Sequence, residues 1–145
     1  MQPSKQCIDL IKASEQCRLK AYMPTPNDVP TIGWGSTGPD VKLGMTWTQE
    51  QADSRFMSDV AKFSQGVQRY LTVAPTQGQL DGMVCLAYNI GLGAFGKSTL
   101  CRKHNLKDFK GAALEFPKWN KQAGKVLRGL TIRREKERVM YASAA

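Results

Sequence analysis

Long apolar runs are missing from this sequence. No stretch approaches the roughly 18–20 consecutive apolar residues that a membrane-spanning helix requires. The residues before Cys7 also lack a basic segment followed by an apolar one, so we expect no secretory signal peptide. These absences argue against an integral membrane protein and predict that the chain first accumulates in the cytoplasm.

Ligands for a metal ion are also scarce. The chain has one histidine, His104, and four cysteines, none of which form a Cys-x-x-Cys pair. A zinc site needs several such side chains at short spacing, so we expect no metal site. Without an export signal, reduced cysteines with structural roles are the expectation.

Positive charge is what the sequence has in excess. Its 145 residues include 21 Lys and Arg against 12 Asp and Glu, a net charge of +9, and most of the excess follows Lys97. Such a balance predicts attraction to a polyanion, whether nucleic acid, an anionic membrane or an anionic cell wall. Charge alone does not choose among these partners, and a basic surface without a specific target would have the same composition.

The first helix is expected to start after Pro3, with Ser4 as its N-cap. Ile8, Ile11 and Glu15 follow at i, i+3 and i+7, so they share one face of that helix. The carboxylate of Glu15 therefore extends an otherwise apolar stripe. Burial there and the nearby helix C-terminus would both favour a protonated carboxyl, as a general acid requires.

Residues 22–37 form a different kind of segment. Three prolines forbid a continuous helix, Asn27-Asp28 is typical of a turn, and 31–34 reads as a short strand. We therefore predict a small hairpin directly after the first helix. It offers Asp28, Thr31 and more weakly Asn27 as partners for Glu15, although an Asp in such a turn commonly binds the turn's own backbone.

The rest of the chain is patterned as helices. Thr46 and Gln49 suggest a capping box before a long amphipathic helix that ends near Leu71. Another helix should start at Pro75-Thr76 and end at Gly91. Shorter helices are expected at 98–104 and 108–119, the second disturbed at Pro117, and a basic one from about 131 to 141.

These elements predict an α+β fold that is mostly α. We expect a helical bundle with a small N-terminal β-hairpin region and a substrate cleft between the two. The whole chain, 1–145, should form one domain. Its hairpin lobe would cover about 17–45, and its helical lobe 46–145 plus the first helix.

Three ordered motifs carry a resemblance to a known family. They are EQCRLKAY at 15–22 with PTIGWGST at 30–37, YNIG at 88–91 with AFGKSTL at 94–100, and GLTIRREKER at 129–138. Together they resemble the phage-type lysozymes, glycoside hydrolase family 24, over nearly the whole chain. The resemblance implies a lysozyme-like fold and activity on bacterial peptidoglycan.

The resemblance also implies roles for individual residues. Glu15 takes the position of the general acid, and Thr31 that of a threonine that helps to hold the attacking water. Either Arg133 or Arg134 would orient Glu15. Further residues are expected to contact the sugars of the substrate; these are Tyr22, Gly33, Trp34, Gly35, Tyr88, Asn89 and Ser98.

One departure from the family pattern concerns the second catalytic group. The family places an Asp or Cys where this chain has Pro24, and the connection to Thr31 is one residue longer than usual. The altered loop could bring Asp28 to the water, or Asp28 could serve the turn while Thr31 carries the water. If no second carboxylate is needed, the reaction would be that of a lytic transglycosylase, which uses the sugar's own hydroxyl as nucleophile.

The function implied is that of an endolysin, a muramidase that cleaves the β-1,4 bond between N-acetylmuramic acid and N-acetylglucosamine for host-cell lysis. It would need no cofactor, act as a monomer, and wait in the host cytoplasm until a holin opens the route to the wall. The alternatives of another class are a nucleic-acid-binding domain using the basic segment 97–138, or membrane disruption by the basic C-terminal helix. We expect neither nucleic acid nor specific membrane binding.

Overall fold

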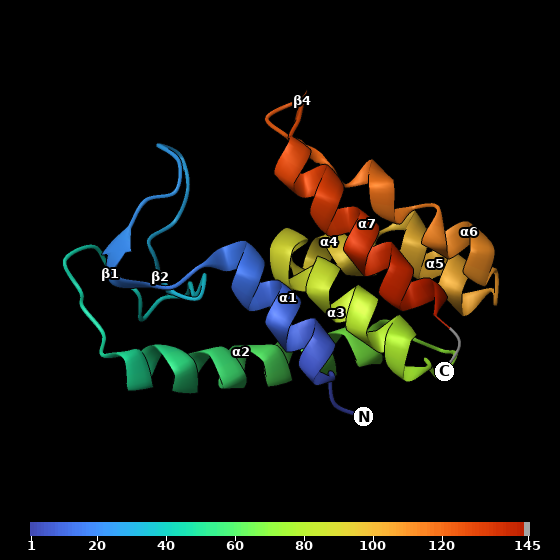
Figure 1. The fold of residues 1–145 in the computed structure, drawn as a ribbon, viewed down its shortest axis with the longest axis horizontal. Helices are drawn as coiled ribbons and strands as arrows, with labels where there is room; N and C mark the ends of the chain where they lie inside the picture. Colours follow the sequence, from blue (N-terminus) through green and yellow to red (C-terminus); the bar gives the residue numbers. More distant parts are fainter. Residues whose placement is uncertain (144–145) are drawn as a thin grey trace.

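The computed structural model describes residues 1–143 and is mostly helical, with two small antiparallel strand pairs (Figure 1). The helices are α1 Lys5–Glu15, α2 Gln49–Tyr70, α3 Gln77–Ile90, α4 Leu92–Gly96, α5 Thr99–Asn105, α6 Phe109–Ala113, the short 3-10 helix η1 Phe116–Lys118 and α7 Arg128–Ala142. The strands are β1 Arg18–Tyr22, β2 Thr31–Gly33, β3 Lys121–Gln122 and β4 Lys125–Val126. The predicted mostly helical α+β class is confirmed.

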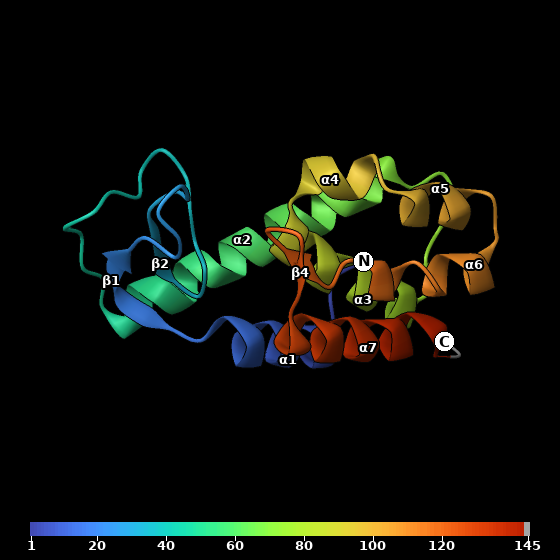
Figure 2. The same cartoon turned by 90° about the horizontal axis from the view of Figure 1, so that it is seen from above.

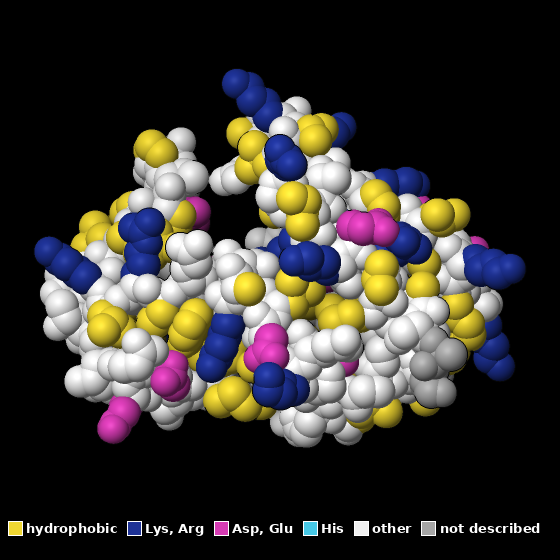
Figure 3. Space-filling model, viewed as in Figure 1, with side chains coloured by type: hydrophobic (Ala, Val, Ile, Leu, Met, Phe, Trp, Pro, Cys, Tyr) yellow, Lys and Arg dark blue, Asp and Glu magenta, His cyan; other side chains and the backbone are white. Residues whose placement is uncertain are grey.

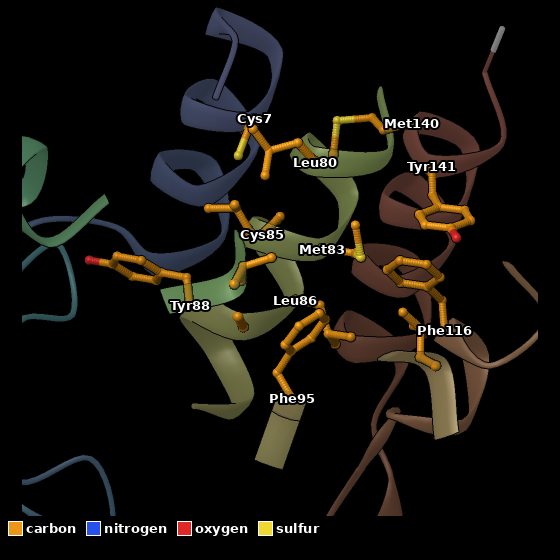
Figure 4. Close-up of a cluster of buried hydrophobic side chains, with 14 of the residues drawn as sticks. Cys7, Leu80, Met83, Cys85, Leu86, Tyr88, Phe95, Phe116, Met140 and Tyr141 are labelled. Carbon is orange, nitrogen blue, oxygen red and sulfur yellow. The ribbon is translucent and has the colours of Figure 1, made fainter. Parts of the chain in front are cut away.

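Helix α3 is the centre of the helical lobe, and α1, α2, α4 and α7 pack around it. Every residue from 79 to 88 is buried, which explains why 83–88 is apolar on all sides rather than along one stripe. Buried side chains from α1, α3, α4, η1 and α7 meet in this core (Figure 4). The helix starts at the predicted place, with a capping box between Thr76 and Gln79.

The hairpin lobe contains β1, β2 and the loops beside them. Arg18 pairs with Gly33 and Tyr22 with Thr31, with an irregularity in between. A small separate cluster, Ala21, Ile32 and Val41, is buried beneath it. Helix α2 extends from this lobe to the underside of the helical lobe, so one rigid element joins the two (Figures 1 and 2). The predicted domain boundaries stay a prediction.

Several local expectations were wrong. The capping box of α2 is made by Thr48 and Gln51, because Thr46 pairs with Lys20 as an extension of the strand region. Ser4 is the N-cap residue of α1 as predicted, although its hydroxyl donates to Asp81 and makes no capping bond to the helix backbone. The helix expected at 108–119 breaks into α6 and η1, α7 begins at Arg128, and both α4 and the β3–β4 hairpin were missed.

Candidate active site

A cleft of about 560 Å³ lies between the two lobes. The space-filling view shows it as a hollow between the projecting loop of the hairpin lobe and the projection that carries β4 (Figure 3). Its walls come from α1, the hairpin region, α2 and the end of α3. The lining residues are Glu15, Tyr22, Pro24, Asp28, Thr31, Gly35, Thr37, Arg55, Asp59, Lys62, Phe63, Tyr88, Asn89, Ile90 and Gly91.

Glu15 is the last residue of α1, and its side chain is 21% exposed to the cleft. One carboxylate oxygen, Oε1, accepts a hydrogen bond from Arg133 at 3.0 Å. The other oxygen lies against Gly35, where an added Cβ would come within 2.7 Å of Oε2. The carboxyl group is therefore confined on one side by a guanidinium and on the other by backbone that has no side chain.

Arg133 is itself fixed by buried partners. It is 6% exposed, and it donates to Glu137 at 3.2 Å and to the carbonyl oxygen of Cys85 at 3.0 Å. Glu137 is fully buried. Burial raises the pKa of its carboxyl, while the guanidinium groups of Arg134 and Arg133 oppose that rise by favouring the charged form.

Arg134 contacts a different cleft residue from Arg133. It donates to the side-chain oxygen of Asn89 at 2.9 Å and to the carbonyl oxygen of Trp119 at 3.2 Å. Its other terminal nitrogen donates to Glu137 Oε2 at 2.9 Å. Its Nε and Glu137 Oε1 lie 2.7 Å apart as an ion pair without the alignment of a hydrogen bond. Of the two candidate arginines, Arg133 thus contacts Glu15, and Arg134 orients Asn89 at the cleft.

The opposite wall is the turn between β1 and β2, and it is held by short-range contacts. The Asp28 carboxylate accepts from the backbone N–H of Val29 at 2.8 Å and, at 3.5 Å, from the hydroxyl of Thr25. Thr31 is 6% exposed, and its hydroxyl donates to the carbonyl oxygen of Val29 at 3.1 Å. Pro24 lines the same wall, so the residue that replaces the expected Asp or Cys does face the cleft.

Tyr88 ties the two lobes together at the base of the cleft. Its hydroxyl donates to the carbonyl oxygen of Trp34 at 2.6 Å, just beyond the end of β2. Burial, reinforced by the charges of Asp59 and Glu15, raises the pKa of this phenol, so it stays a hydrogen-bond donor. Tyr88 therefore lines the cleft and also anchors the hairpin lobe to α3.

A further carboxylate in the cleft, Asp59, was not predicted. It is 9% exposed, accepts from the Ser36 hydroxyl at 2.7 Å and from Arg55 Nε at 2.9 Å. Arg55 also donates to the carbonyl oxygen of Thr37 at 2.7 Å and to Asp40 at 2.6 Å. The sequence did hold a signal for Asp59, because it lies three residues after Phe56 on the apolar face of α2, much as Glu15 lies four residues after Ile11 on α1.

Comparison with known proteins agrees with this geometry. The family model described as "Phage lysozyme" matches residues 12–137, which include the cleft residues of both lobes. The chain belongs to the phage lysozyme family.

Two curated relatives of this phage lysozyme family member differ in length. The endolysin of Bacillus phage B103 is 44% identical over 142 residues, which are 97% of this chain and 54% of that protein. The endolysin of Salmonella phage P22 is 37% identical over 147 residues and is covered to 99%, as is this chain. The chain thus spans about half the length of its Bacillus phage relatives, 54% and 56%, and nearly all of the P22 protein.

Solved structures of the phage lysozyme fold superpose over nearly the whole chain. The endolysin from Escherichia coli O157:H7 phage FAHEc1 aligns with a TM-score of 0.82 and 37% identity, covering 98% of this chain and 94% of that one. The muramidase domain of SpmX from Asticaccaulis excentricus aligns with a TM-score of 0.87 and 29% identity, covering 99% of both chains. The arrangement of hairpin lobe, cleft and helical lobe is therefore that of the family.

Within this family fold, three of the expected substrate contacts lie outside the cleft. Gly33 packs against the start of α2 and the segment before it, where an added Cβ would come within 3.1 Å of the Trp47 ring and 3.4 Å of Ala52. Trp34 donates from its ring nitrogen to Asp53 at 2.8 Å and packs its ring near Phe56. Both side-chain positions face α2 and the segment that leads into it, so contact of Gly33 and Trp34 with the substrate stays a prediction.

Ser98 also lies away from the residues that line the cleft. It is the N-cap of α5, accepting from the backbone N–H of Cys101 at 3.1 Å, and its hydroxyl donates to the carbonyl oxygen of Phe95 at 2.6 Å. It faces a separate pocket beside Tyr70. The expected residues that do line the cleft are Glu15, Tyr22, Asp28, Thr31, Gly35, Tyr88 and Asn89.

The expectations about a metal site and about a membrane-spanning helix can be compared with the structure of residues 1–143. Within that range, no three His, Cys, Asp or Glu side chains are grouped as metal ligands would be. No helix in the same range combines the length and the apolar character needed to cross a membrane.

Proposed function

We propose that this chain is a muramidase that hydrolyses the β-1,4 bond between N-acetylmuramic acid and N-acetylglucosamine in bacterial peptidoglycan. The observation that carries the proposal is Glu15, which faces the cleft between the lobes while Arg133 and Gly35 confine its two oxygens. A carboxyl group held in this way can deliver a proton to the glycosidic oxygen of a sugar chain lying in the cleft. The names of its relatives, endolysins and a muramidase domain, support the same reaction.

Thr31 is the better candidate for holding the attacking water. Its hydroxyl hydrogen is used by Val29, which leaves the oxygen lone pairs free to accept a hydrogen bond from a water molecule. Asp28 is the weaker candidate, because its carboxylate closes the turn through Val29 and Thr25. Tyr22, Gly35, Tyr88 and Asn89 would contact the sugars from the positions they occupy along the cleft.

As an endolysin, the protein would act as a monomer, collect in the host cytoplasm and reach the wall once a holin permeabilises the inner membrane. The net charge of +9 would draw it to the anionic wall. The nucleic-acid alternative loses two of its basic residues, because Arg133 and Arg134 are buried in ion pairs and cannot reach a phosphate backbone.

The deciding experiment is mass analysis of the fragments released from purified peptidoglycan. We expect reducing muramic acid ends from the parent protein and no cleavage by Glu15→Gln. Asp9→Asn is the matched control, since Asp9 is an exposed carboxylate on the same helix that pairs only with Lys5. An active Glu15→Gln protein would refute the assignment of the acid.

A lytic transglycosylase is the second candidate, and one observation favours it. Pro24 lines the cleft at the place where the family has an ionisable group, and the carboxylate of Asp28 is engaged by its own turn. Anhydro-muramic ends in the same mass spectra would establish this reaction instead, with Glu15 acting as both acid and base.

A further inference from the structure

The backbone turn 34–37 is what holds the free side of Glu15. An added Cβ at Gly35 would lie 2.7 Å from Glu15 Oε2 and 3.2 Å from its carboxyl carbon, so the turn and the carboxyl group are in direct contact. Gly35 has a φ of +89°, a conformation that L side chains rarely adopt. Any outward movement of this turn would therefore widen the space beside the carboxyl group.

Three side chains from the helices form hydrogen bonds with three of the four residues of this turn. Tyr88 of α3 donates to the carbonyl oxygen of Trp34 at 2.6 Å. Asp59 of α2 accepts the hydroxyl hydrogen of Ser36 at 2.7 Å, and Arg55, one helical turn earlier, donates to the carbonyl oxygen of Thr37 at 2.7 Å. Gly35, the residue that touches Glu15, lies in the middle of these anchored positions.

Asp59 and Arg55 act as one unit. They form an ion pair of 2.9 Å at i, i+4 spacing on α2, and Arg55 is held from its other side by Asp40 at 2.6 Å. Ser36 is 1% exposed and Asp59 9% exposed, so bulk water could not readily replace the hydrogen bond between them. The two helical residues thus hold the turn through bonds that are shielded from solvent on the Ser36 side.

We propose that Asp59 and Arg55 are positioning residues for the general acid, acting through the turn 34–37. Among the described residues, their hydrogen bonds go to the turn, to each other and to Asp40, and none goes to Glu15. They fix the turn that defines where the carboxyl group can sit. This inference rests on the proposed function, because it assigns a role relative to Glu15 as the acid.

The geometry predicts which kinetic constant should change. Positioning acts on the chemical step, so loosening the turn should lower kcat while KM changes little. A merely structural role would lower the free energy of unfolding without changing the kcat of the molecules that remain folded. Removing the Ser36 hydroxyl is the mildest way to separate the two, because it leaves the Asp59–Arg55 ion pair in place.

The experiment compares Ser36→Ala with Ser64→Ala on soluble peptidoglycan chains, well below the unfolding temperature of each variant. Ser64 is the matched control, since it is also 1% exposed and its hydroxyl oxygen accepts a side-chain hydrogen bond from Gln68 on α2 at 2.9 Å. We expect Ser36→Ala to lose roughly tenfold in kcat with KM within about twofold. Ser64→Ala should keep the parent kcat even if it is equally destabilised.

A second set of variants keeps the inference testable if the first gives a small effect. Asp59→Asn should lower kcat as Ser36→Ala does, and the double variant should lose no more than the stronger single one, because both act through one contact. Ser36→Thr keeps a hydroxyl and should restore most of the rate. Parent-like kcat in both Ser36→Ala and Asp59→Asn would overturn the inference, as would an equal loss in Ser64→Ala.

Failure of the proposed function would look different from these outcomes. If the parent protein releases no muramic acid ends, or if Glu15→Gln stays active, the acid assignment itself fails. If the parent cleaves and Glu15→Gln does not, while Ser36→Ala and Asp59→Asn match the parent, only the positioning role of the turn is refuted.

Discussion

The two walls of the cleft are built on different principles. On the helical side, Glu15 is bonded to Arg133, which is bonded to the fully buried Glu137, so the acid is held by residues 118 or more positions away in the sequence. On the hairpin side, Asp28 and Thr31 bond to residues within three positions of themselves. One wall depends on the packed core, and the other depends on its own turn.

This difference has consequences for mutation. Buried charges that share partners are costly to disturb, because each one left without its partner has no water to replace it. Exposed turn contacts are individually weak and can re-form with solvent. The acid should therefore be sensitive to changes in the core, whereas the hairpin wall should tolerate changes that spare the hydroxyl of Thr31.

The strongest test of the comparison is Glu137→Gln. It leaves the buried Arg133 and Arg134 without their shared carboxylate, which should cost about 3–5 kcal/mol of unfolding free energy and release Glu15 from its orientation. Urea unfolding and wall cleavage measure both effects. The control is Glu135→Gln, which removes an exposed carboxylate of α7 paired with Arg138 and should change stability little. Equal losses in the two variants would contradict the view that the acid is held through buried charges of the core.

Gly35→Ala should have the next largest effect. Its Cβ would come within 2.7 Å of Glu15 Oε2, and its φ of +89° adds roughly 1–2 kcal/mol of backbone strain. Gly44→Ala separates the two causes, since Gly44 has a φ of +93° with no heavy atom within 4 Å of the added Cβ. Both variants should lose stability in thermal unfolding, but only Gly35→Ala should lose most of its wall-cleaving activity. An inactive Gly44→Ala protein would mean that strain, and not contact with the acid, accounts for the loss.

On the hairpin wall, Thr31→Val and Asp28→Asn should behave differently. Thr31→Val keeps the shape of the side chain but removes the oxygen proposed to hold water, so we expect kcat to fall about tenfold, equivalent to about 1.4 kcal/mol. Asp28→Asn can still accept from Val29 and should stay within about twofold of the parent rate. Steady-state kinetics on soluble peptidoglycan decide; a larger loss in Asp28→Asn would make Asp28 the residue that acts on the water.

The sequence predicted the parts of the molecule whose signals are local. The position of Glu15 on an apolar helical stripe could be predicted from spacing, whereas its role as the acid was implied by the family resemblance. The hairpin was predicted because its prolines exclude a helix. The start of α3 was found from its capping box at Thr76. For α2, Thr46-x-x-Gln49 and Thr48-x-x-Gln51 match the same pattern, and only the pairing of Thr46 with Lys20 in the folded chain decides between them.

The parts that could not be predicted depend on contacts between distant segments. Which arginine meets Glu15 is decided by the packing of α7 on α3, not by the spacing of Arg133 and Arg134. Trp34 comes directly after β2, but its ring packs toward Phe56 of α2. Packing in the core determines the direction of this side chain, and its position in the sequence does not reveal it. Asp59 was overlooked although it shares the apolar face of α2, because its contact with Ser36 joins segments that are distant in the sequence.

The smallest expected effect concerns the pH dependence of the helical lobe. His104 is fully buried, with Nε2 placed to donate to the carbonyl oxygen of Val73 at 3.0 Å and Nδ1 2.7 Å from the Tyr141 hydroxyl. Burial lowers its pKa below the ordinary value of 6.5, so the unfolded chain takes up a proton more readily than the folded one. The stabilising contribution of neutral His104 is present above the unfolded pKa and is lost as pH falls through it toward the folded pKa.

Because the sequence contains one histidine, few other side chains titrate between about pH 7.5 and about pH 5.5. The parent protein should therefore lose more in Tm over this interval than His104→Gln, whose side chain does not ionise. Thermal unfolding at the two pH values measures the difference. Equal losses of Tm in the two proteins would mean that groups other than His104 cause the loss of stability at low pH. That result would weaken the view that the packed helical lobe responds to changes in charge more than the exposed turn does.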